Sequence, residues 1–187
     1  MNLPKYKHGK QTTPIEFTVF DNSMKHGDFK KRSHRSFLAF LYWFGVRKSE
    51  ALERVKEDFQ IRDGVLVVDC PAKKGGEREP LEVYMDLPYV NLIIEQIEKT
   101  RKGKKLWRFS ERTAINVVKR ALGEKYYPHF LRLNRATHFL EDPETTVPDM
   151  KAWFGWKSAQ TIDDYIGYSR RNIRRQRDRL RREVEAK

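Results

Sequence analysis

One short segment of this chain carries a strand pattern, and it restricts the fold to a mixed class. Residues 59–62 and 65–68 are rich in Val, Ile and Phe, and the dipeptide Asp63-Gly64 separates them. Asp-Gly is a preferred dipeptide of the two-residue type I′ turn, which joins antiparallel strands. A second turn, Lys73-Lys74-Gly75-Gly76, follows, and a third short strand is expected near residues 78–84. The pattern predicts a small three-stranded antiparallel sheet.

Outside this segment the apolar residues recur with the period of a helix. The stretch before Gly45 is strongly apolar, which favours a buried helix that stops at this glycine. Ser110 is a candidate N-cap, Pro128 a candidate first-turn residue and Gly155 a candidate helix end. Helices are expected over residues 29–44, 48–57, 89–100, 110–122, 129–140, 147–154 and 159–166. The predicted fold class is therefore α+β, mainly helical, with one small sheet inserted between helices.

The balance of charge indicates a polyanionic partner. The 187 residues include 39 Lys and Arg against 26 Asp and Glu, a formal charge of +13. A domain this basic most often binds nucleic acid, and a charge that only aids solubility is the simpler alternative. The single cysteine, Cys70, excludes an intrachain disulfide and is typical of a reducing compartment. No apolar run approaches the roughly 18 residues of a membrane span. We therefore expect an intracellular location, in the cytoplasm or nucleoid.

The chain is expected to form one domain with two flanking segments. Residues 1–28 mix Lys, His, Pro, Thr and Gly without sustained periodicity, so an N-terminal arm or linker is predicted. Residues 29–168 hold the periodic elements. Residues 169–187 contain eight arginines and no Gly or Pro, which predicts a basic helical tail. The candidate DNA contacts of this tail are Arg170, Arg171, Arg174 and Arg175.

A series of side chains suited to a phosphodiester runs through the chain. His129 and Arg132 lie three residues apart, hence on one face of a predicted helix. Arg132 and Arg47 both carry planar guanidinium groups, which bind two phosphate oxygens and stay charged. Trp156 offers an indole N–H donor, although an indole after a helix end is more often a core residue. Tyr165 offers a phenol, and a phosphodiester formed on it can be reversed by a DNA hydroxyl.

In this order the residues resemble the catalytic domain of the tyrosine recombinases, the phage-integrase family. The resemblance covers about residues 30–168 and implies the catalytic-domain fold of that family. It implies that Tyr165, ten residues beyond Gly155, is the nucleophile, with Tyr168 as its competitor. The residues that would hold the phosphate oxygens are Arg47, His129, Arg132 and Trp156. Tryptophan stands where most members of the family have histidine, which keeps a donor but puts proton transfer there in doubt.

The same resemblance assigns a general acid and a supporting carboxylate. The family places its acid lysine in the turn between two strands, and Lys74 is predicted to have this role, with Lys73 as the alternative. Glu50, three residues after Arg47, matches an acidic position of the family and would orient an arginine or stabilise the framework of the site. His138, on the same predicted helix, is expected to be structural.

The resemblance implies an enzyme: a site-specific DNA recombinase or integrase that works through a 3′-phosphotyrosine and a free 5′-hydroxyl. No cofactor is expected, neither metal nor ATP, because the covalent intermediate retains the energy of the broken bond. The expected partner is double-stranded DNA. Four protomers are expected on synapsed DNA, and a monomer is the candidate state in free solution. A virus, a plasmid or a provirus is a candidate carrier of the gene for such a chain.

Several alternatives stay open from sequence alone. A type IB topoisomerase relaxes DNA with a related tyrosine site, and a DNA-binding protein with a decayed recombinase site is the alternative outside enzymes. Most relatives carry an N-terminal helical domain that completes a clamp around DNA, and residues 1–28 are too few for it. An excised catalytic domain, a single-domain recombinase and the C-terminal piece of an interrupted integrase are all compatible with this. The tail would contact DNA, or dock on a neighbouring protomer.

Overall fold

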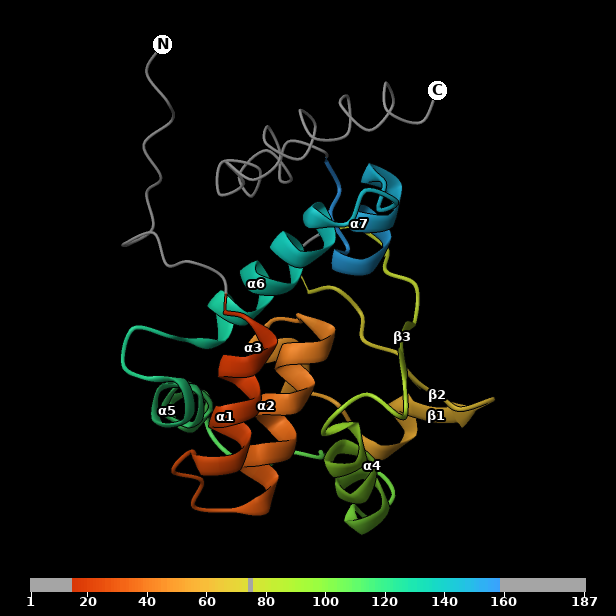
Figure 1. Cartoon of the computed structure of the whole chain (residues 1–187). Helices are drawn as coiled ribbons and strands as arrows, with labels where there is room; N and C mark the ends of the chain where they lie inside the picture. The colour runs from red at the N-terminus through yellow and green to blue at the C-terminus, as the bar shows by residue number, and fades with distance from the viewer. Residues whose placement is uncertain (1–14, 74–75, 159–187) are drawn as a thin grey trace.

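The computed structural model of the chain describes residues 15–73 and 76–158 (Figure 1). Its elements, in chain order, are α1 (Phe17–His26), α2 (Arg32–Phe44), α3 (Lys48–Ala51), the 3-10 helix η1 (Lys56–Asp58), β1 (Phe59–Arg62), β2 (Val65–Val68), β3 (Leu81–Tyr84), α4 (Val90–Lys99), α5 (Glu111–Leu122), α6 (Pro128–Glu141) and α7 (Val147–Phe154). The fold is α+β and mainly helical, as predicted. Among the described residues, no helix is long and apolar enough to cross a lipid bilayer.

Helix α2 forms the centre of the core because it is apolar on nearly every side. Its residues from Phe37 to Leu41 are completely buried, and the helix packs against α4, α5, α6 and β3. The helix ends at Gly45, where φ is 61° and a Cβ would lie 2.7 Å from the Cβ of Arg135 on α6. Only glycine fits this left-handed end so close to another helix, and α6 therefore reaches the C-terminal end of α2.

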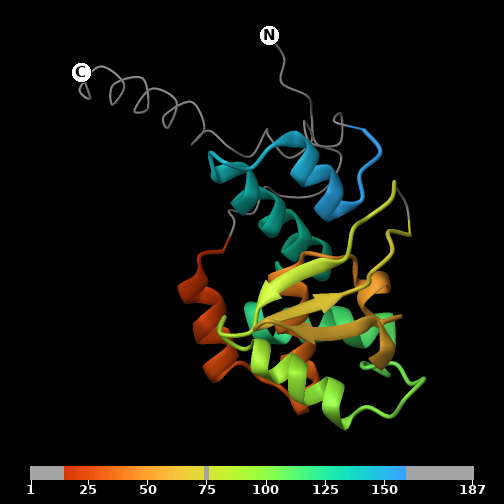
Figure 2. The same ribbon diagram turned by 90° about the vertical axis from the view of Figure 1, so that its right-hand side faces the viewer.

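The three strands form one antiparallel sheet in the order β1-β2-β3, which confirms the predicted sheet (Figure 2). Asp63 and Gly64 between β1 and β2 have φ values of 51° and 75°, the positive values that a type I′ turn requires. The register places Phe59, Val68 and Leu81 opposite one another. These three side chains are buried, so this face of the sheet is the one that packs on the helices.

The prediction of an N-terminal arm through residue 28 is wrong for residues 17–26, which form α1. Only Phe20 and Met24 of this helix are buried, and two apolar positions do not make a readable periodic stripe. The ring of Phe20 stacks on that of Tyr42 in α2, with centroids 3.7 Å apart. Helix α1 is therefore stabilised by packing on α2 rather than by a strong local pattern.

The helix predicted over residues 48–57 ends after α3. Arg54 instead donates from Nη1 to the carbonyl oxygen of Asp69, and the Asp58 carboxylate accepts the backbone N–H of Val55 at 2.9 Å. These contacts turn the chain into η1 and the sheet. The helices predicted over 89–100, 110–122, 129–140 and 147–154 are confirmed to within one residue at each end, and the first predicted helix begins at Arg32 instead of residue 29. The helix predicted over 159–166 lies outside the described residues.

Candidate active site

Arg47, His129, Arg132 and Trp156 lie on or next to three separate helices. Arg47 is the residue before α3, and Arg132 lies on the second turn of α6. His129 lies one turn earlier on α6, which confirms the helical spacing predicted for this pair. Trp156 follows Gly155, which ends α7 with a φ of 62°. The predicted residues outside the described part of the chain are Lys74, Tyr165, Tyr168, Arg170, Arg171, Arg174 and Arg175.

Glu50 is a fully buried carboxylate that brings three arginines together. Its Oε1 accepts from Nη1 of Arg47 at 2.7 Å, and its Oε2 accepts from the backbone N–H of Arg47 at 3.0 Å. Nη1 of Arg78 donates to Oε2 at 3.0 Å, and Nη1 of Arg132 lies 4.0 Å from the same oxygen. We call these four residues the Glu50 cluster. Three guanidinium groups against one carboxylate leave two positive charges in the cluster.

The surroundings of Glu50 keep it ionised. Burial alone would raise the pKa of this carboxyl group. The charge of Arg78 opposes that effect, and so do the hydrogen bonds from Arg47 and the charge of Arg132. The result is a pKa below the usual value of 4.5, so Glu50 carries its negative charge at neutral pH.

Arg132 is buried between the ends of two helices. Its Nη1 donates to the carbonyl oxygen of Gly45 at 3.2 Å, and its Nη2 donates to that of Phe154 at 2.8 Å. These carbonyls belong to the C-terminal ends of α2 and α7, where the helix dipole favours a cation. The guanidinium also lies 5.0 Å from the centre of the Phe154 ring and 5.8 Å from that of Trp156. Its position is thus fixed from several directions.

Trp156 and His129 differ in how far they are buried. The ring of Trp156 is buried and stacks on Phe154 with centroids 4.6 Å apart, which is the packing of a core residue. A donor role for its indole N–H stays a prediction. His129 is exposed at the start of α6. The pKa of His138 is lowered, first by burial and then by the charge of Arg135, so His138 is neutral at neutral pH, in keeping with the structural role expected for it.

The two described ends of the lysine turn are attached to the site. The backbone N–H of Lys73 donates to Oε1 of Glu50 at 3.3 Å, and that of Gly76 donates to the carbonyl oxygen of Gly155 at 2.9 Å. The Lys73 ammonium lies 2.5 Å from a carboxylate oxygen of Glu53, with 39% of the lysine side chain exposed. The chain on either side of Lys74 is therefore held against the Glu50 cluster and α7.

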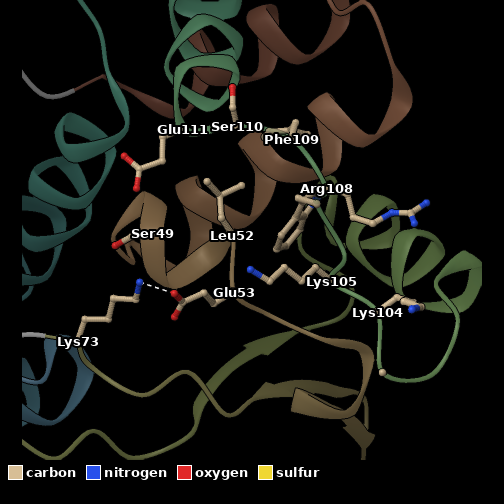
Figure 3. A pocket seen from close by; sticks show the side chains of 12 residues that line it. Ser49, Leu52, Glu53, Lys73, Lys104, Lys105, Arg108, Phe109, Ser110 and Glu111 are labelled. Carbon is tan, nitrogen blue, oxygen red and sulfur yellow. Dashed lines mark ion pairs between the residues drawn. The ribbon is translucent and has the colours of Figure 1, made fainter.

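A cavity of about 620 Å³ opens beside this turn (Figure 3). Lys73 and Glu53 lie on one side of it, and Figure 3 shows the Lys105 ammonium pointing in from the other side. The charged residues of its lining are Glu53, Lys73, Lys104, Lys105, Arg108 and Glu111.

Sequence reasoning missed Arg78, which was expected only to begin the third strand. Its side chain is 0% exposed and contacts Glu50, Cys70 and Phe154. Its position just after the lysine turn was the only available signal, because an arginine is normally expected to be exposed. Cys70, its neighbour, is a buried thiol whose pKa burial raises to about 11, so it is protonated and unsuited to nucleophilic attack.

The described residues do not place three or more His, Cys, Asp or Glu side chains where they could hold a metal ion. The chemistry available from the Glu50 cluster is instead electrostatic. Two arginines with fixed positions, Arg47 and Arg132, can bind the oxygens of one phosphate, and Glu50 holds them in place.

Comparison with known proteins finds one related sequence and several related folds. No family model matches the chain. The tyrosine recombinase XerC of Pseudomonas syringae pv. syringae (strain B728a) is 27% identical over 126 residues, covering 63% of this chain and 42% of XerC.

Solved structures of similar fold include the XerH site-specific recombinase bound to palindromic difH substrate, with a TM-score of 0.71 and 16% identity over 88% of this chain and 52% of XerH. They also include the XerA recombinase, with a TM-score of 0.67 and 18% identity over 96% of this chain and 67% of XerA. A third is the Tn1549 transposon integrase in complex with transposon right end DNA, with a TM-score of 0.62 and 13% identity over 92% of this chain and 67% of the integrase.

The chain therefore spans about half the length of XerC and XerH. The part that it spans has the fold described above, with the small sheet between α3 and α4. The chain therefore has the fold of a tyrosine recombinase catalytic domain, and its sequence is similar to that of XerC.

Proposed function

We propose that this chain is the catalytic domain of a site-specific DNA recombinase or integrase. The Glu50 cluster carries the proposal, because it holds Arg47 and Arg132 on one buried carboxylate next to the lysine turn. Such an arrangement has a clear use in phosphoryl transfer. The cluster has two positive charges in excess, and the phosphorus centre gains negative charge as it is attacked.

In the proposed reaction the Tyr165 oxygen attacks the scissile phosphorus. The bond from phosphorus to the 5′-oxygen breaks, which leaves a 3′-phosphotyrosine and a 5′-hydroxyl. Arg47 and Arg132 hold the nonbridging oxygens, with His129 and Trp156 as further donors. The reverse attack, by a 5′-hydroxyl of the same or another strand, rejoins DNA and releases the tyrosine.

The proton for the leaving 5′-oxygen is assigned to Lys74. Lys73, the alternative, already has a carboxylate partner in Glu53, which supports the choice of the second lysine. The support is limited in energy, because a half-exposed ion pair contributes only about 0–1 kcal/mol.

The proposed partner is double-stranded DNA. The XerH and Tn1549 integrase structures are DNA complexes, and this chain has a formal charge of +13. Two further cavities, of about 380 and 500 Å³, are lined by basic residues and, within the described part of the chain, by no acidic ones. Their basic residues are Lys30, Lys31, His34, Lys99, Arg101, Lys104, Lys105, Arg108 and Arg120. Assembly of four protomers on synapsed DNA, and action inside a cell, belong to the same proposal.

Trapping on a nicked suicide substrate tests the reaction. The wild-type protein should become covalently linked to DNA that carries a recombination site, and Tyr165→Phe should not. DNA binding should change little, because one hydroxyl group adds little to many phosphate contacts. The matched control is Tyr168→Phe, which should still form the covalent complex.

Three other results would each change the conclusion. A peptide map with DNA on Tyr168 would move the nucleophile. Relaxation of a supercoiled plasmid without strand exchange would indicate a type IB topoisomerase. Binding without any covalent product, on every candidate attachment site, would indicate a DNA-binding protein with an inactive site.

A further inference from the structure

We propose that Arg78 is a positioning residue for DNA cleavage, which fixes Arg132 and the lysine turn relative to each other. The proposal rests on the proposed function, since it assigns a role in the same reaction. The proposal gives Arg78 no contact with the substrate, because its Nη1 and Nη2 donate to Glu50, Cys70 and Phe154 inside the protein. Arg78 acts through Phe154 and Glu50, which also contact Arg132.

Arg78 and Arg132 share one hydrogen-bond acceptor and one carboxylate partner. The carbonyl oxygen of Phe154 accepts from Nη2 of Arg132 at 2.8 Å and from Nη2 of Arg78 at 3.0 Å. Oε2 of Glu50 lies 3.0 Å from Nη1 of Arg78 and 4.0 Å from Nη1 of Arg132. A displacement of one guanidinium is therefore expected to disturb the contacts of the other with this carboxylate and this carbonyl.

Arg78 also joins the two sides of the loop that carries the lysines. It lies after the lysine turn, and its Nη1 donates to the carbonyl oxygen of Cys70, before the turn, at 2.7 Å. The same side chain reaches α3 through Glu50 and the end of α7 through Phe154. One buried side chain thus connects the loop of the proposed acid with the two elements that hold Arg132.

Stability alone is a poor explanation for this arrangement. A buried ion pair gives little or no net stabilisation compared with apolar side chains of the same volume. The Nε of Arg78 is buried without a hydrogen-bond acceptor among the described residues, which is a further cost. An arginine is needed where two acceptors on different elements must be held at a fixed angle, because its donors form a rigid planar group.

The proposal makes lysine the informative substitution. Arg78→Lys keeps a positive charge opposite Glu50 but has one nitrogen, which cannot bridge Glu50 and Phe154 in the same way. The cleavage rate at saturating DNA should fall by roughly 100-fold, the scale expected for small misplacements of reacting groups. The Kd for DNA should change less than about 3-fold, because the proposal gives Arg78 no phosphate contact of its own.

Single-turnover cleavage of a nicked suicide substrate measures the rate, and salt-controlled titration of the same DNA measures the Kd. The matched control is Arg62→Lys, at the end of β1, where the arginine side chain is 59% exposed and pairs with Glu82 at 2.9 Å. The control should cleave like the wild type. A wild-type rate for Arg78→Lys would overturn the proposal, and so would a loss of DNA affinity as large as the loss of rate.

A measurement without cleavage separates this proposal from the proposed function. In NMR spectra of protein with ¹⁵N-labelled arginine, hydrogen exchange at the Nε–H of Arg132 should become faster in Arg78→Lys and stay unchanged in Arg62→Lys. Unchanged exchange in both variants would refute the link between Arg78 and Arg132, whatever the activity. If the wild type never links to DNA, the proposed function fails, while this exchange measurement still tests the link.

Discussion

Gly155→Ala tests how tightly the lysine loop packs against the end of α7. Gly155 has a φ of 62°, and a Cβ built on it would lie 2.5 Å from the Cβ of Ala72. The Ala72 methyl group is fixed to the backbone and cannot rotate away. The substitution should therefore force the loop and the end of α7 apart, and should weaken the hydrogen bond from Gly76 to Gly155.

Two effects add up in this substitution. A left-handed backbone costs a residue with a side chain about 1–2 kcal/mol. Inserting a methyl group into a packed site costs typically about 1–3 kcal/mol more. Gly155→Ala should thus lower the free energy of unfolding by about 2–5 kcal/mol, the sum of these two ranges.

The two effects can be measured separately by chemical denaturation. Gly103 has a φ of 68° with nothing within 4 Å of a built Cβ, so Gly103→Ala should show the backbone effect alone. Ala72→Gly removes the methyl group that collides, so the double variant Gly155→Ala, Ala72→Gly should recover the steric part. The coupling free energy between the two substitutions should be about 1–3 kcal/mol. A Gly155→Ala variant no less stable than Gly103→Ala, or a coupling near zero, would refute the close packing.

Three other predictions concern the acid, the pH and the tail. Lys74→Ala should slow cleavage of ordinary DNA at least about 100-fold. A substrate with a 5′-bridging sulfur, whose leaving group needs no proton, should restore most of that rate. Rescue of Lys73→Ala but not of Lys74→Ala would assign the acid role to Lys73. The pKa values of His34 and His138 are lowered from 6.5, first by burial, so the unfolded chain binds protons that the folded one does not. The contribution of these two histidines to the free energy of unfolding is complete above pH 6.5 and declines below it. The urea midpoint should therefore fall as the pH is lowered from 7.5 to 5, and it should fall less steeply in a variant without both histidines. Equal slopes of midpoint against pH in the two proteins would contradict this. If the tail contacts about three phosphates, deletion of residues 170–187 should reduce the slope of log K against log salt by roughly 2.7. An unchanged slope together with lost assembly would indicate that the tail docks on another protomer.

The parts of the fold that depend on local backbone geometry were predictable from sequence. Gly45 and Gly155 end helices because their φ values are positive, and Asp63-Gly64 forms the hairpin for the same reason. The spacing of His129 and Arg132 predicted that they share one face of a helix, because three residues are close to one helical turn. The role of Tyr165 came from resemblance alone and stays a prediction.

Contacts between distant segments were not predictable in this way. Helix α1 was not predicted because its sequence has only two buried apolar residues, and its packing depends on Tyr42 and the rest of α2. Helix α3 ends early because Arg54 and Asp58 find partners outside a helix.

The sequence by itself determined the hairpin, the helix ends at Gly45 and Gly155, and the common helix of His129 and Arg132, because turns and helical spacing depend on neighbours along the chain. Only the tertiary structure decided how these residues are held. Arg78 is 28 residues from Glu50 and 76 from Phe154, and it contacts both. An arginine in a sequence is expected at the surface, and burial in a network of charges arises only when distant segments fold together and supply its acceptors.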